Sequence, residues 1–94
     1  MNILWDDEKN IKLKKERKIS FEEITLLILE KKYVEIMKHP KRPGQRVFIL
    51  PINGYVHAVP FLLDDNDNII LKTAFPSRKF HKKYGQKNNE DKTR

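Results

Sequence analysis

The dipeptide Asn53–Gly54 constrains the fold more than any other feature of this sequence. It separates two apolar runs, QRVFILPI at residues 45–52 and YVHAVPFLL at residues 55–63. A two-residue type I′ turn needs positive φ at both central positions, and Asn-Gly is the pair that accepts this most readily. The sequence therefore predicts a β-hairpin in the middle of the chain.

Further strands are predicted on both sides of this hairpin. Their segments are NILW at residues 2–5, YVEIM at 33–37 and IILKTAF at 69–75. HPKRPG is a loop and DDNDN a polar turn, so four consecutive strands are joined by short connections, which favours an antiparallel meander. Pro51 and Pro60 each remove a backbone donor, and we expect each at a sheet edge, a bulge or a strand end.

Two helices are predicted before the meander. Residues 6–18 begin with acidic and end with basic side chains, an order that complements a helix dipole. Ser20 and Glu23 form a capping-box signature for a second helix that ends near Lys32. A short third helix capped by Ser77 is expected near the C-terminus. The predicted class is α+β, with the two N-terminal helices packed on one face of the antiparallel β-meander.

Size and charge narrow the function. The chain has 94 residues and a net charge of +7, so we expect one domain over residues 1–85 and a disordered polar tail over 86–94. The charge suggests an acidic partner, with nucleic acid favoured over an acidic protein or an anionic membrane surface. A merely solvated basic surface is the plain alternative. The basic helices lack the apolar face that membrane binding requires.

Neither a metal site nor a cofactor site is predicted. His39, His57 and His81 lack the spacing of a zinc motif, and no phosphate-cradling glycine loop is present. The chain has no cysteine, which fits a cytoplasmic location. The N-terminus does not read as a signal peptide, and the longest apolar runs are too short to span a bilayer.

The stretch IILKTAFPSRKFHKKYG carries most of the candidate site residues. The hydroxyls of Thr73 and Ser77 and the guanidinium of Arg78 lie at the end of the last predicted strand, and such groups suit the binding of an RNA phosphate. The structural alternative is a turn at the end of the strand followed by a helix cap. The remaining candidates for RNA contact are Lys79, Lys82, Lys83 and Tyr84. Tyr84 suits either core packing or base stacking.

Two histidines are candidates for proton transfer. His57 lies among apolar neighbours and suits either a structural role or acid–base chemistry. His81 lies in the basic run, whose positive charges favour its neutral, proton-accepting form. A ribonuclease that works without metal needs a base, cations and an acid, and Lys, Arg, His and Tyr can supply all three.

The N-terminal run WDDEKNIKLKKERKISFEE resembles the start of BrnT-type toxins of bacterial type II toxin–antitoxin pairs. The matching residues are Trp5, Asp6 and Lys9, followed without a gap by residues 19–23. Arg46 in QRVF stands where that family has an arginine at the start of a central strand. The resemblance extends over about residues 3–85 and implies a compact RelE-like fold. It also makes Lys9 and Arg46 candidate catalytic residues.

Some residues depart from the family pattern. Asp7 replaces the usual proline, and Arg17 and Lys18 stand where the family often has His-Gly. Phe75 occupies the place of a strand-end arginine, for which Arg78 is a candidate substitute.

The resemblance implies a metal-independent endoribonuclease that slows growth by cleaving RNA. A cognate antitoxin, encoded beside it, is the expected protein partner, and a homodimer of the toxin is one possible arrangement within that complex. The catalytic candidates are then Lys9, Arg46, His57, Arg78 and His81. The alternative is a non-catalytic RNA-binding module or an inactive relative that retains only partner binding, which the Phe75 departure motivates.

Overall fold

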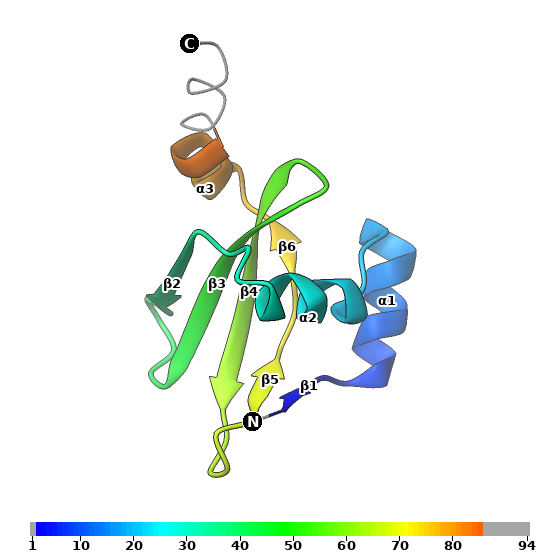
Figure 1. Ribbon diagram of the computed structural model, residues 1–94, viewed down its shortest axis with the longest axis vertical. Coiled ribbons are helices and arrows are strands. Elements are labelled where there is room, and N and C mark those ends of the chain that lie inside the picture. Colours follow the sequence, from blue (N-terminus) through cyan, green and yellow to red (C-terminus); the bar gives the residue numbers. More distant parts are fainter. Residues whose placement is uncertain (1, 86–94) are drawn as a thin grey trace.

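The computed structural model describes residues 2–85, so the predicted disordered tail lies outside the described residues. The strands are β1 (Ile3–Leu4), β2 (Glu35–Lys38), β3 (Gln45–Ile52), β4 (Tyr55–Leu63), β5 (Ile69–Leu71) and β6 (Phe75–Pro76). The helices are α1 (Asp7–Arg17), α2 (Phe21–Leu29) and α3 (Arg78–Phe80), and a π-helical turn, η1 (His81–Gly85), follows α3. The α+β class is confirmed (Figure 1).

All the strands belong to one sheet with the order β1-β5-β4-β3-β2. β6 also pairs with β4, on the same edge as β5 but nearer the start of β4. Neighbours from β2 to β5 are antiparallel, whereas β1 runs parallel to β5 with Ile3 opposite Ile69. The hairpin between β3 and β4 has the predicted turn, because φ is 53° at Asn53 and 82° at Gly54.

The predicted last strand, residues 69–75, is not continuous. β5 ends at Leu71, and β6 begins at Phe75 and pairs with Ala58. The backbone N–H of Lys72 donates to the carbonyl of Pro60 at 2.9 Å. In an antiparallel strand the N–H and C=O of one residue point to the same neighbouring strand. Pro60 has no backbone N–H, so it cannot donate the second hydrogen bond of this pair to Lys72. Residues 72–74 therefore leave the sheet ladder.

Side-chain caps begin the first two helices. Oδ1 of Asp6 accepts the N–H groups of Glu8 and Lys9 at 2.8 and 3.2 Å, and Oγ of Ser20 accepts that of Glu23 at 3.0 Å. The second helix ends at Leu29, before the predicted end at Lys32.

The main core lies between the first two helices and one face of the sheet. α2 crosses this face in Figure 1, and α1 lies beside β5 and β6. Phe21, Ile24 and Ile28 of α2 are buried in one cluster with Phe48 and Phe61 of the sheet. A smaller cluster on the opposite face contains Val47, Ile49, Val56 and Ala58, with Phe80 and Tyr84 packed against it.

Candidate functional site

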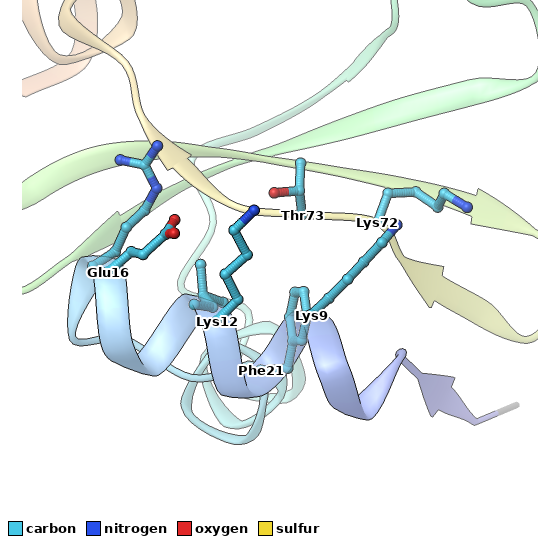
Figure 2. Close-up of a pocket in the computed structure, with 8 residues that line it drawn as sticks. Lys9, Lys12, Glu16, Phe21, Lys72 and Thr73 are labelled. Carbon is cyan, nitrogen blue, oxygen red and sulfur yellow. The ribbon is translucent and has the colours of Figure 1, made fainter.

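A groove of about 370 Å³ opens between α1 and the segment that connects β5 to β6. Figure 2 shows Lys9 and Lys12 projecting from α1 toward the segment that carries Lys72 and Thr73. Glu16 supplies a carboxylate to the same groove. Lys9, Lys12 and Glu16 are three and four residues apart, so they share one face of the helix.

A second groove, of about 420 Å³, adjoins the first. Lys9, Lys72 and Thr73 line both grooves. The residues that the second groove adds are His39, Lys41, Arg42, Gln45, Pro60 and Phe75. Lys41 and Arg42 come from the β2–β3 loop that follows His39, so cations from three separate parts of the sequence line two grooves that share Lys9, Lys72 and Thr73.

A third cleft, of about 360 Å³, continues from the second and shares His39, Pro60 and Phe75 with it. Lys79 and Phe80 of α3 line its far side. We call the three joined grooves the basic track. Its polar side chains are Lys9, Lys12, Glu16, Arg17, Lys38, His39, Lys41, Arg42, Gln45, Lys72, Thr73 and Lys79.

The cations of the basic track have no carboxylate partner among residues 2–85. Within that range, one ion pair is present, between Nζ of Lys14 and Oε1 of Glu22 at 3.7 Å, and it lies outside the track. Unpaired ammonium and guanidinium groups along neighbouring grooves suit a polyanion, because each can replace a counterion at a phosphate.

His39 is held in one tautomer by its own loop. Its Nδ1 accepts the backbone N–H groups of Lys41 and Arg42 at 3.1 and 3.2 Å. A nitrogen that accepts carries no proton, so the proton of the neutral ring is on Nε2. His39 is therefore a hydrogen-bond donor in the track. None of His39, Lys41 and Arg42 was predicted as a site residue from the sequence, although the basic composition of HPKRPG was a usable signal.

His57 is buried, with 7% of its surface exposed. Its Nδ1 lies 2.8 Å from the carbonyl oxygen of Tyr55, which places the proton of the ring on Nδ1. Burial lowers the pKa of His57 below its ordinary value, against the opposing effect of this hydrogen bond. Arg17, which lines the first groove, lowers the same pKa by its charge.

His81 packs against the start of β4, close to the position of His57 in that strand. Its ring stacks on Tyr55 with 4.0 Å between the centroids, and its Nδ1 accepts the N–H of Val56 at 3.2 Å. A Cβ on Gly85 would lie only 2.7 Å from this nitrogen, so the chain passes very close to the ring. These contacts give His81 a structural role, and His81 is not among the residues that line the basic track.

Arg46 lies in a different groove, of about 360 Å³, whose wall is mostly apolar. Its neighbours there include Ile28, Phe48, Phe61 and Leu63. The structure therefore separates Arg46 from Lys9, the other candidate that the family resemblance supplied.

The C-terminal candidates divide between structural contacts and the track. Oγ of Ser77 caps α3 by accepting the N–H of Phe80 at 3.3 Å, and Tyr84 packs against the smaller core cluster. Lys79 lines the third cleft. Arg78, Lys82 and Lys83 are not among the side chains that define the track. Of the predicted site residues, the structure thus brings Lys9 and Thr73 together, and Lys79 lines the adjoining third cleft.

Within residues 2–85, no group of three or more His, Asp or Glu side chains is arranged to hold a metal ion. Each helix in that range is too short or too polar to traverse a lipid bilayer.

No model of a known protein family matches the sequence, and no curated protein matches it. The structure, in contrast, is similar to the 1.1 Å crystal structure of the Brucella abortus ribonuclease toxin BrnT. The TM-score is 0.62, the sequences are 17% identical, and the alignment covers 82% of this chain and 96% of the other. The resemblance predicted from the sequence is therefore confirmed at the level of the fold: this chain is folded like BrnT.

Proposed function

We propose that this protein is the toxin of a type II toxin–antitoxin pair and acts as a metal-independent endoribonuclease. One observation carries the proposal: Lys9, Lys72 and Thr73, from two separate elements, line two adjoining grooves whose cations are free of carboxylate partners among the described residues. The similarity in fold to a ribonuclease toxin supports it.

The scissile phosphate is placed over Lys9, Lys72 and Thr73, the side chains common to both grooves. Two ammonium groups there stabilise the extra negative charge of the pentacoordinate phosphate, and the Thr73 hydroxyl donates a hydrogen bond to a phosphate oxygen. Nε2–H of His39 is a further donor. Nδ1 of His39 already accepts two N–H groups of its own loop, so we assign His39 a role in binding rather than in proton transfer.

Proton transfer is assigned to Glu16 and Lys9. The Glu16 carboxylate takes the proton of the ribose 2′-hydroxyl as O2′ bonds to phosphorus. The bond from phosphorus to O5′ then breaks, and the Lys9 ammonium gives O5′ a proton. The products are a 2′,3′-cyclic phosphate and a free 5′-hydroxyl. Glu16 is the carboxylate that lines the first groove.

The remaining parts of the proposal come from the family resemblance. A cognate antitoxin encoded nearby binds and neutralises the protein, and both act in the cytoplasm. Co-expression of the neighbouring gene product should restore growth and co-purify with this chain. Normal growth without any partner would contradict the toxin assignment.

Cleavage in the absence of metal tests the activity directly. The purified protein is incubated in EDTA with a single-stranded RNA, and with the same strand carrying one 2′-deoxyribose at the cleaved position. The proposal predicts cleavage of the first and loss of that cut in the second, with products that end in a cyclic phosphate. Cutting of both strands would contradict 2′-hydroxyl attack.

The alternative is an RNA-binding protein that does not cut. Phe75 favours it, because it stands where the BrnT-type pattern has a strand-end arginine, and Arg46 lies away from the track. Under this alternative, RNA binds with a steep dependence on salt and remains intact, both in EDTA and in the presence of ribosomes. Any metal-free cleavage that Lys9→Ala abolishes excludes it.

A further inference from the structure

The third cleft of the basic track differs from the other two grooves because most of the side chains that line it are apolar. Its apolar side chains are Met37, Pro40, Val47, Ala58, Pro60, Phe75 and Phe80. The charged or polar side chains at this cleft are Lys38, His39 and Lys79. An apolar slot therefore opens directly from a groove that is lined with cations.

Phe75 is the exposed aromatic of this slot, with 39% of its surface accessible. It lies on β6, which pairs with β4 through Ala58, and it lines both the second groove and the third cleft. The ring of Phe80, by comparison, is covered by Lys79, whose Nζ lies 5.7 Å from the ring centroid. Phe75 is thus the ring that can offer a free face to a ligand.

We propose that Phe75 is a stacking platform for one nucleobase of the RNA, held in the third cleft beside the bound phosphate. The inference rests on the proposed function, because it takes the ligand of the adjoining groove to be RNA. An aromatic ring next to a cationic groove is the arrangement by which proteins bind single strands, since each base offers a flat face for stacking. A base in a duplex is already stacked on both sides, so this site selects single-stranded RNA.

A singly exposed phenylalanine is common on protein surfaces and needs no ligand to explain it. Two observations favour a ligand here. The ring belongs to an apolar slot rather than to a convex surface, and the slot shares His39, Pro60 and Phe75 with the groove where the phosphate is proposed. A nucleotide has this combination of a flat apolar part and an adjoining anion.

Substitutions that keep or remove the aromatic ring test the proposal. Phe75→Leu keeps an apolar side chain, and Phe75→Trp keeps a ring. The probe is a short single strand with 2′-methoxy groups, which 2′ attack cannot cut, and the same sequence as a duplex. Stacking contributes about 1–3 kcal/mol per base, so Phe75→Leu should weaken single-strand binding about 5- to 150-fold. Phe75→Trp should bind like the wild type, and duplex binding should change little.

Fluorescence gives a second readout that a purely structural role would not move. Stacking of a base should quench Phe75→Trp when the strand is added, relative to the wild type, whose single tryptophan is Trp5. Leu26→Ala, at an exposed apolar residue of α2, serves as the control and should bind like the wild type. Unchanged affinity of Phe75→Leu together with no quenching would overturn the proposal.

The same variants show whether the stacking proposal or the proposed ribonuclease activity is wrong. If Phe75→Leu binds and cuts RNA normally and Phe75→Trp is not quenched, the stacking platform is wrong and the ribonuclease assignment stands. If the wild type never cuts RNA but Phe75→Trp is quenched by the single strand, the platform stands and the catalytic assignment fails.

Discussion

Asn10 of α1 is joined to Phe21, the first residue of α2. The Oδ1 of Asn10 accepts the backbone N–H of Phe21 at 2.8 Å, and its Nδ2 donates to Oε1 of Glu22 at 2.8 Å. Only 5% of the Asn10 surface is exposed. This side chain satisfies a backbone donor that the start of a helix would otherwise leave unpaired. It also fixes α1, and with it Lys9, relative to α2.

Asn10→Leu should destabilise the protein by about 1–3 kcal/mol, because the buried N–H of Phe21 loses its acceptor. Urea unfolding followed by circular dichroism measures this change. Asn66→Ala, in the exposed turn between β4 and β5, should shift the free energy of unfolding by less than about 0.5 kcal/mol. Equal stability of the two variants would show that the Asn10 contacts do not hold the two helices together.

The salt dependence of RNA binding should show whether Lys72 contacts a phosphate directly. Each contact with a single strand contributes about 0.7 to the slope of log K against log salt, so Lys72→Ala should lower that slope by about this amount. Lys15→Ala removes the same charge from α1 but not from the basic track, and should leave the slope nearly unchanged. Binding titrations at several salt concentrations decide the matter. A slope for Lys72→Ala equal to that of the wild type would remove Lys72 from the interface.

The burial of His57 predicts a loss of stability in mild acid. Its pKa in the folded protein is lowered from the ordinary value of 6.5, chiefly by desolvation. Above that value the ring is neutral in both states and the contribution is fully present. As the pH falls from 6.5 to the lowered pKa, the unfolded chain binds the proton more readily than the folded protein, so stability is lost.

Melting temperatures at pH 7.5 and pH 5.0 measure this dependence. The decrease at pH 5.0 should be smaller in His57→Gln than in the wild type, whereas the control variant Asn66→Ala, which removes no titratable group, should keep the wild-type decrease. If the melting temperature of His57→Gln decreases as much as that of the wild type, a group other than His57 causes the loss of stability in acid.

Local sequence signals predicted the elements of the fold well. Asn53–Gly54 and Ser20 act through contacts within a few residues, and both have the expected geometry. The break between β5 and β6 was missed because it depends on Pro60 in the neighbouring strand. The effect of a proline on another strand cannot be read before the register is known.

The candidate site was only partly predictable, for a similar reason. The family resemblance supplied Lys9, and the hydroxyl at a strand exit supplied Thr73; the structure brings these two together. His39 and Arg42 were missed because nothing local shows that the β2–β3 loop lines the same groove as Lys9. Conversely, the basic run after Ser77 looked like a site because of its charge, while the packing of Tyr84 and the stacking of His81 assign part of it to the structure.

The most direct test of the central claim is the single-turnover rate of RNA cleavage in EDTA for the wild type, Lys9→Ala, Lys72→Ala and Lys15→Ala. All three variants lose one positive charge, but only the first two remove it from the basic track. Our account predicts that Lys9→Ala and Lys72→Ala cut at least about tenfold more slowly, the scale of losing one transition-state contact, and that Lys15→Ala cuts like the wild type. Equal rates for all four proteins would show that the chain cuts RNA somewhere other than in this groove.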